Sequence, residues 1–275
     1  MLHCFAKAPL LALAFVVGTS ATAPAWEMDG QEVDVELVLA VDVSLSVTPR
    51  EMEVQRRGYA EAITSNEVMT AVRAGLLGSI AVTYVEWAGG ASQRTVIDWT
   101  LIETPDDAQA FADVLLNSPP SSLRRTSISN ALIYAADTFD GNGFEGLRKV
   151  IDISGDGPNN SGGPVVQARN EVTSRGIVIN GLPLMTREGY GGRWDLEDLD
   201  VYYEDCVIGG PGAFVIPVTE WSEFATAVRR KLVMEIAGLV PRAEARIILA
   251  SEPAPYDCLI GERIWDTTRP ISGTP

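Results

Sequence analysis

The chain has 275 residues and a formal net charge of −16, with 46% hydrophobic and 21% charged residues. This length and balance suit a globular protein with one large domain or two small ones. The excess of acidic residues argues against a basic patch for nucleic acid and against binding to an anionic membrane surface. A divalent cation or a basic partner is easier to reconcile with such a chain.

Residues 1–25 have the pattern of a secretory signal peptide. Lys7 precedes an apolar run at residues 9–17, and the small residues around Ala23 and Ala25 fit a cleavage site. The run is shorter than a membrane-spanning helix needs, and no later segment reaches that length, so we expect no transmembrane segment in the mature chain. A buried N-terminal helix is the less favoured alternative. We therefore expect a bacterial periplasmic or secreted protein.

Cleavage of this peptide would leave two cysteines and no histidine, because His3 and Cys4 lie within it. In an oxidising compartment Cys206 and Cys258 most simply form one disulfide, which would pin the C-terminal tail to the body. Two separate buried thiols are the alternative. A Ser-His-Asp triad is excluded in a mature chain that has no imidazole.

Strand-like and helix-like segments alternate along the mature chain. Residues 79–89 and 94–102 are rich in β-forming residues and read as a hairpin. The other expected strands are 33–43, 148–154, 177–184 and 213–218, and the expected helices are 49–65, 104–118, 126–139, 163–176 and 220–238. A long acidic and aromatic loop is expected at 186–211, and an irregular, Pro-rich tail from 241.

This alternation predicts an α/β fold, a three-layer α/β/α sandwich with a mostly parallel, doubly wound sheet. The hairpin adds one antiparallel edge strand. We expect one domain at residues 26–240 and a C-terminal tail at 241–275 packed on it. In such sheets the ligand site lies beyond the carboxyl ends of the strands.

Oxygen-bearing side chains follow the ends of two expected strands. Asp42, Ser44 and Ser46 end the first strand, and on alternate positions of an extended chain they would point the same way. Asp156 follows the strand at 148–154, and Thr126 opens a helix on the same side. Two carboxylates and three hydroxyls suit Mg²⁺, Mn²⁺ or Ca²⁺ rather than Zn²⁺ or Cu²⁺.

These residues resemble the metal-ion-dependent adhesion site (MIDAS) of von Willebrand factor A-type (vWA) domains. The residues that carry the resemblance are Asp42, Ser44 and Ser46, Thr126 before the sequence NAL, and Asp156 before a glycine. The resemblance covers about residues 33–237, and looks closest to an exported bacterial branch carrying SGDGPNN and GGPGAFVIPV.

The resemblance implies a role for each residue. Ser44, Ser46 and Thr126 would contact the metal directly, Asp42 and Asp156 would act mostly through water, and a carboxylate of a protein or peptide partner would fill the open position. Two departures from the family pattern concern the surroundings of these residues. Arginines at 124 and 125 stand where many members have glycine, and the third motif reads Ser-Gly-Asp-Gly instead of Thr-Asp-Gly.

We expect a non-enzymatic, metal-dependent ligand-binding domain with a role in adhesion or periplasmic assembly. The resemblance further implies that the last helix, at about 220–237, shifts when the metal binds. A metal-assisted hydrolase and a scaffold with a purely structural metal are the alternatives. The loop at 186–211 suggests a recognition surface that presents Tyr190, Trp194, Tyr202 and Tyr203, a second Ca²⁺ site, or a solvated acidic loop tied down by Cys206.

Overall fold

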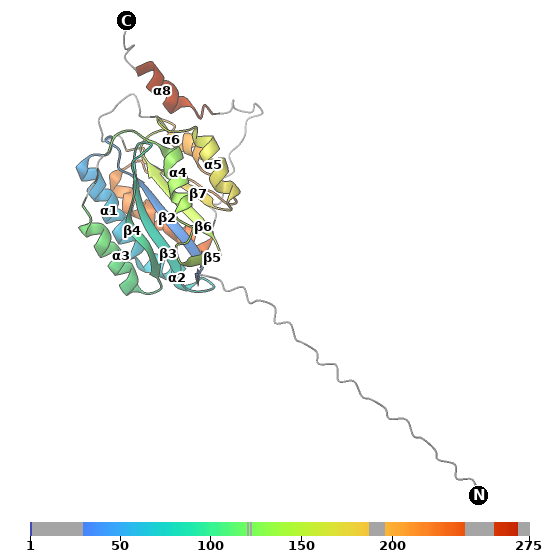
Figure 1. The fold of residues 1–275 in the computed structure, drawn as a ribbon. Coiled ribbons are helices and arrows are strands. Elements are labelled where there is room, and N and C mark those ends of the chain that lie inside the picture. Colours follow the sequence, from blue (N-terminus) through green and yellow to red (C-terminus); the bar gives the residue numbers. More distant parts are fainter. Residues whose placement is uncertain (2–29, 120, 122, 187–195, 240–255, 269–275) are drawn as a thin grey trace, which may run out of the picture.

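The structure is a computed structural model that describes residues 1, 30–119, 121, 123–186, 196–239 and 256–268. Its main sheet has five strands in the order β4-β3-β2-β6-β7. Only β3 and β4 pair in antiparallel fashion, so the predicted α/β fold with an antiparallel edge strand is confirmed (Figure 1). The strands are β2 (Val35–Asp42), β3 (Ile80–Trp87), β4 (Gln93–Ile102), β6 (Lys149–Gly155) and β7 (Val178–Pro183).

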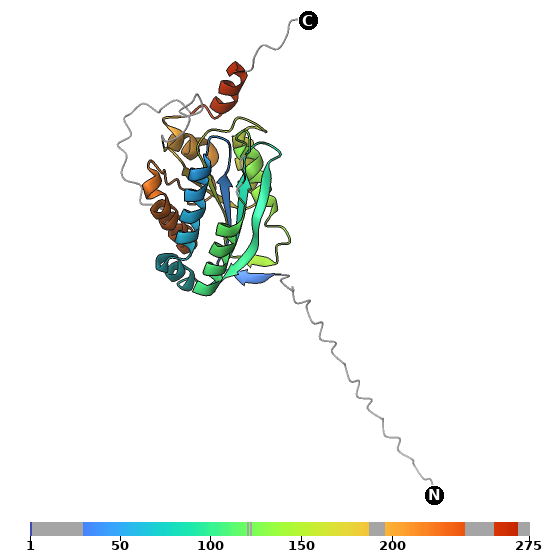
Figure 2. The ribbon, with the colours of Figure 1, turned by 90° about the vertical axis from the view of Figure 1, so that its left-hand side faces the viewer.

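Helices cover both faces of this sheet, and Figures 1 and 2 show the resulting three layers. Side chains of β2 alternate between two hydrophobic cores, with Leu37 and Leu39 in one and Val38 and Ala40 in the other. The first core is closed by α1 (Pro49–Ile63), α2 (Asn66–Arg73), α3 (Pro105–Asn117) and α7 (Phe224–Ala237). The second is closed by α4 (Ile128–Asp137), α5 (Val165–Ser174) and α6 (Leu199–Tyr202).

A capping box fixes the start of α1 directly after the polar turn that follows β2. The Thr48 hydroxyl accepts the amide of Glu51 at 3.3 Å, and the Glu51 carboxylate accepts the amide of Thr48 at 2.7 Å. Pro49 occupies the first helical turn, where its missing N–H is not needed. The polar turn is therefore held between a buried strand and a firmly capped helix.

The strand expected at 33–43 is interrupted at Asp34. The carboxylate of Asp34 accepts the amides of Leu77 and Gly78 at 3.0 and 2.8 Å, which turns the chain between two strands. The part before Asp34 is β1 (Gln31–Val33), which pairs in parallel with β5 (Phe144–Gly146) in a separate two-stranded sheet.

The strand expected at 213–218 does not form a regular ladder. Val215 and Val218 make only isolated bridges, to Gly181 and Leu184 of the β7 edge. Pro183 lacks the N–H group that would continue the series of bonds donated by Gly181 to Phe214 and by Met185 to Val218. The segment still follows the edge of the sheet. The predicted position of the strand is therefore right, and only its predicted regular strand structure is wrong.

Two segments expected to be irregular contain helices. The end of the loop at 186–211 forms α6 and a π-helical turn at Tyr203–Val207. The tail contains α8 (Ile260–Thr268), which lies beyond the end of the sheet toward which the β2 arrow points (Figure 2). Within the described ranges, no helix is both long and apolar enough to cross a membrane.

Buried charges hold α7 on the sheet. Lys231 lies 2.7 Å from the carboxylate of Asp152 on β6 and also pairs with Glu235 one turn along the helix, and all three side chains are fully buried. Arg148 donates to the last carbonyls of α7, those of Glu235 and Ile236, at 2.7 and 2.6 Å. The predicted shift of this helix on metal binding stays a prediction, and such a shift would disturb these contacts.

Candidate metal centre

The polar turn after β2 gathers three of the predicted ligands. Asp42 is the last residue of β2 and is fully buried, and its Oδ1 accepts the amide of Ser44 at 2.7 Å. The hydroxyls of Ser44 and Ser46 lie 2.9 Å apart. The amide of Val47 donates to the Ser44 carbonyl at 3.0 Å, so a tight turn brings these side chains together. The expectation of an extended chain with alternating side chains is wrong for this segment.

Asp156 joins this cluster from the end of the neighbouring strand β6. The Ser46 hydroxyl donates to Asp156 Oδ1 at 2.9 Å, which links two segments 110 residues apart. Gly155, directly before Asp156, packs against Asp42. A Cβ atom at that position would come within 2.8 Å of the Tyr203 hydroxyl and 3.1 Å of Asp42 Oδ2. The glycine in Ser-Gly-Asp-Gly is therefore required for close packing.

Thr126 reaches the same edge through main-chain contacts of its loop. The amide of Leu123 donates to the Val43 carbonyl at 3.0 Å, and Leu123 bridges to Ser44. Thr126 itself is buried. Among the hydrogen bonds of the described residues, the side-chain series runs from Ser44 through Ser46 to Asp156 and does not include the Thr126 hydroxyl.

Two asparagines of the SGDGPNN segment position these elements, and sequence reasoning did not identify them. Asn160 bonds to both main-chain polar groups of Thr126. Asn159 is fully buried, and its Oδ1 accepts the amide of Ser129 in the first turn of α4 at 3.1 Å. The only signal in the sequence was the unusual pair of amides directly after Asp156.

The buried end of the cluster carries an unsatisfied carboxylate oxygen. Asp42 Oδ2 accepts no hydrogen bond from the described residues. Burial raises the pKa of Asp42 well above its ordinary value, and the nearby negative charge of Asp156 raises it further. Burial likewise raises the pKa of Tyr203, with Asp42 as the next contributor. A cation at this edge would offset the repulsion between the two carboxylates.

The donor set fits a hard cation. It offers two carboxylates and three hydroxyls, the oxygen ligands that Mg²⁺, Mn²⁺ and Ca²⁺ accept. In the described part of the chain, no three or more His, Cys, Asp or Glu side chains are grouped so as to hold a metal ion. Exposure rises from the buried Asp42 to the exposed Ser46, so the open side of the cluster faces solvent.

The loop before Thr126 contains a backbone conformation that would favour glycine at a position occupied here by arginine. Arg125 has φ of 73°, the left-handed region in which glycine is the least strained residue. The guanidinium of Arg125 lies over the ring of Trp265, 4.6 Å from its centroid. This stacking contact can offset part of the cost of the left-handed backbone.

The predicted disulfide is present, and the predicted aromatic surface is partly wrong. Cys206 and Cys258 are bonded, with their Cα atoms 5.5 Å apart. Tyr202 and Tyr203 are fully buried in the core beside α6 and cannot form a recognition surface. Tyr190 and Trp194, also counted in that hypothesis, lie outside the described residues.

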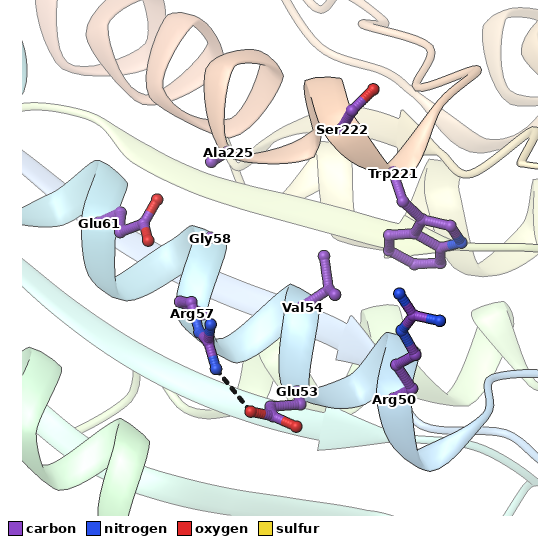
Figure 3. Close-up of a pocket in the computed structure, with 9 residues that line it drawn as sticks. All are labelled: Arg50, Glu53, Val54, Arg57, Gly58, Glu61, Trp221, Ser222 and Ala225. Atoms are coloured by element: carbon purple, nitrogen blue, oxygen red, sulfur yellow. Dashed lines mark hydrogen bonds and ion pairs between the residues drawn. The ribbon is translucent and has the colours of Figure 1, made fainter.

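A separate groove lies between α1 and the start of α7 (Figure 3). Its volume is about 390 Å³, and the ring of Trp221 closes one end. Arg50, Arg57, Glu53 and Glu61 line it, and Figure 3 shows Arg57 paired with Glu53. Because these charges balance, the groove favours neither an anion nor a cation, and we assign it no ligand.

The arrangement of sheet and helices is that of a vWA-type fold. A von Willebrand factor type A protein from Catenulispora acidiphila superposes with a TM-score of 0.52 at 13% identity, over 74% of this chain and 43% of that one. Proximal thread matrix protein 1 from the mussel byssus, with a zinc-occupied MIDAS motif, gives a TM-score of 0.56 at 17% identity, over 76% and 49%. The pilus adhesin SpaC of Lactobacillus rhamnosus GG, in an open conformation, gives 0.54 at 12% identity, over 74% and 30%. The chain thus spans less than half the length of each of these proteins.

The chain belongs to the DUF1194 family, described as a protein of unknown function, whose model matches residues 32–240. None of the curated proteins compared with the chain is significantly similar to it. At these identities the solved structures establish the vWA-type fold and leave the ligand and the metal open.

Proposed function

We propose that this protein is an exported vWA domain that binds a protein or peptide ligand through a divalent cation. Asp42, Ser44, Ser46, Thr126 and Asp156 would hold Mg²⁺, or Mn²⁺ or Ca²⁺ in its place. A carboxylate of the ligand would complete the coordination, and no bond of the ligand would be made or broken. The compartment proposed is the bacterial periplasm or the medium.

One observation carries the proposal. The hydroxyls of Ser44 and Ser46 and the carboxylate of Asp156 form a hydrogen-bonded series at the mouth of the cluster, beside the unsatisfied Oδ2 of Asp42. Without a cation this arrangement leaves a buried carboxylate oxygen unpaired, which is costly. A cation bound there would satisfy that oxygen, directly or through water, and leave its outer side open.

The open side supports a protein ligand. Leu45, between the two serines, and Leu123, beside Ser44, are exposed large apolar side chains. Arg124 is exposed in the same loop. Apolar and cationic groups around a cation suit an acidic segment with an apolar neighbour. The adhesin and the zinc-occupied MIDAS among the structural neighbours are consistent with this use of the fold.

Calorimetric titration of the mature chain, residues 26–275, with Mg²⁺, Mn²⁺ and Ca²⁺ tests the metal. We expect saturable binding to the wild type and at least a tenfold loss of affinity in a Ser44→Ala, Ser46→Ala double variant, because two neutral ligands are removed. A Ser174→Ala, Ser222→Ala variant, altered at exposed serines away from the cluster, controls for hydroxyl loss. Equal binding by all three proteins would reject this cluster as the metal site.

Water-proton relaxation of the Mn²⁺-loaded protein then tests the open position. We expect a peptide with a Leu-Asp pair to lower the relaxation enhancement by displacing metal-bound water, and its Leu-Asn counterpart to leave it unchanged. Metal binding without any effect of the Asp peptide would favour a structural metal in a scaffold. Hydrolysis of generic phosphoesters that is lost in Asp42→Asn would instead favour the hydrolase.

A further inference from the structure

Residues 256–268, which we call the C-terminal strap, are fastened beside the candidate metal centre. The disulfide joins Cys258 of the strap to Cys206, 52 residues earlier, at the end of the segment that contains α6. The Tyr256 hydroxyl donates to Asp198 at 2.9 Å, and its ring packs edge-on against Tyr202. α8 begins two residues after Cys258, so the covalent bridge holds the first turn of the helix near this edge of the sheet.

The strap contacts the two loops that carry Thr126 and Asp156. Glu262 accepts the side-chain amide of Asn159 at 2.7 Å, three residues after Asp156. Trp265 stacks on Arg125, the residue directly before Thr126. Gly261 packs so closely that a Cβ there would come within 2.0 Å of the Asn159 carbonyl oxygen. These contacts come from one side of a single helix.

The chemistry of the strap matches that expected of a ligand for this face. Glu262 supplies a carboxylate and Trp265 a large apolar ring, and both meet polar or cationic groups of the metal-bearing loops. One oxygen of Glu262, Oε2, is buried without a hydrogen-bond partner among the described residues. The strap is therefore held by specific residue pairs, but one carboxylate oxygen of Glu262 has no hydrogen-bond partner among the described residues. This unsatisfied oxygen favours replacement of the strap by a ligand that makes better contacts.

We propose that the C-terminal strap is a built-in occupant of the rim of the metal face, which an acidic protein ligand has to displace before its carboxylate can reach the cation. The inference rests on the proposed function for the identity of the incoming ligand. The occupancy of the rim by the strap is a separate claim and can be tested without any metal.

Hydrogen exchange of the oxidised mature chain tests occupancy. Gly261→Ala should force α8 away from Asn159, because the added methyl meets main-chain atoms that cannot rotate aside. We expect exchange in segments 123–130 and 156–162 to rise about tenfold, since their outer contacts are lost. Thr267→Ala is the matched control, because this exposed residue bonds only within α8. Unchanged exchange in Gly261→Ala, or an equal rise in both variants, would overturn the proposal.

A peptide in trans tests the exchange of occupants. A labelled peptide of residues 256–268, with serine at position 258, is added to the full mature chain and to its Cys258→Ser, Gly261→Ala variant. Because the bridge gives the attached strap a high effective concentration, we expect binding to the variant at least about tenfold tighter than to the wild type. Equal binding to both proteins, or binding to neither, would overturn the proposal.

The experiments distinguish failure of the strap proposal from failure of the proposed metal-dependent function. If the calorimetric titration shows no metal while exchange rises in Gly261→Ala, the strap covers the face but the face has no cation. If metal binds and exchange is unchanged in Gly261→Ala, the metal centre stands and the strap is not its cover.

Discussion

Asn160 holds Thr126 by both of its main-chain polar groups. The Thr126 amide donates to the Asn160 side-chain oxygen at 3.0 Å, and the Asn160 amide donates to the Thr126 carbonyl at 2.9 Å. The loop of the third predicted hydroxyl is thus fixed by a residue four positions after Asp156, on another strand end. The position of Thr126 and the conformation of the SGDGPNN segment are therefore coupled.

Replacement of Asn160 by alanine is expected to weaken both the fold and the metal site. The Thr126 amide loses its partner, which should lower the free energy of unfolding by about 1–3 kcal/mol. Metal affinity should fall as the loop loosens. Thermal unfolding and calorimetric titration measure the two effects. Ser161→Ala is the control, because Ser161 contributes only a 3.3 Å bond to the same Thr126 carbonyl, and an equal loss there would refute the special role of Asn160.

Asp42→Asn should have opposite consequences with and without metal. In metal-free buffer the variant removes a buried charge that repels Asp156, so we expect its free energy of unfolding to equal or exceed that of the wild type by up to about 1 kcal/mol. At a Mg²⁺ concentration of about 100 times its Kd the wild type should gain about 2.7 kcal/mol, and the variant much less. Chemical unfolding in both buffers tests this, and parallel shifts in the two proteins would contradict it.

Arg125→Gly and Arg125→Ala should separate the backbone strain from the contact with Trp265. Both variants lose the stacking on the ring, but only glycine relieves the left-handed φ of 73°. We therefore expect the glycine variant to be more stable than the alanine variant by about 1 kcal/mol. Thermal unfolding of the pair provides the comparison. Equal stabilities would show that the loop adjusts its backbone when the side chain is removed.

Glu235 should make stability depend on pH near neutrality. Burial raises its pKa to about 7, with Lys231 opposing the shift and Asp152 adding to it. Because the folded state holds this proton more tightly than the unfolded chain, the contribution is complete below about pH 4.5 and is lost as pH rises through 7, on the order of 3 kcal/mol in all. The pKa of Asp152 is also raised, which acts in the same direction. Asn180, Tyr59 and Arg148 are further polar groups that interact with this cluster.

The measurement is the difference in free energy of unfolding between the wild type and Glu235→Gln from pH 4.5 to 8. Glutamine keeps an acceptor for Asn180 but has no proton to release. We expect the wild type to lose stability relative to the variant across this window. If the difference in free energy of unfolding between the two proteins stays constant over this pH range, Glu235 does not change its protonation on folding and the prediction is wrong.

Much of the fold could be read from local patterns. The hairpin of β3 and β4, strand β6 and helix α1 follow from alternation, turn residues and capping, which act within a few residues. The break at Asp34 could not be read in this way, because its cause is a pair of amides more than 40 residues away. Helix α8 was missed because its place depends on the disulfide and on Asn159.

The candidate site likewise has residues that could be predicted from the sequence and residues whose role depends on distant contacts. Asp42, Ser44, Ser46 and Asp156 were found because parallel strands end at one edge, a rule that requires only the order of elements. The need for glycine at position 155 depends on Tyr203, which comes from the distant turn at Tyr203–Val207 and which only one of the interpretations of the 186–211 loop placed on the surface. The candidate ligands can thus be predicted from topology, whereas the residues that position them can be identified only from the packing.

The covalent bridge between Cys206 and Cys258 has a kinetic consequence. A helix that is undocked but still tethered two residues before its first turn remains within reach of the surface it left. Its return is a first-order process whose rate does not depend on protein concentration, in contrast to the arrival of any external partner. At given affinities, the competition between them is therefore set by the free concentration of the partner, so dilution of the partner should favour the docked strap.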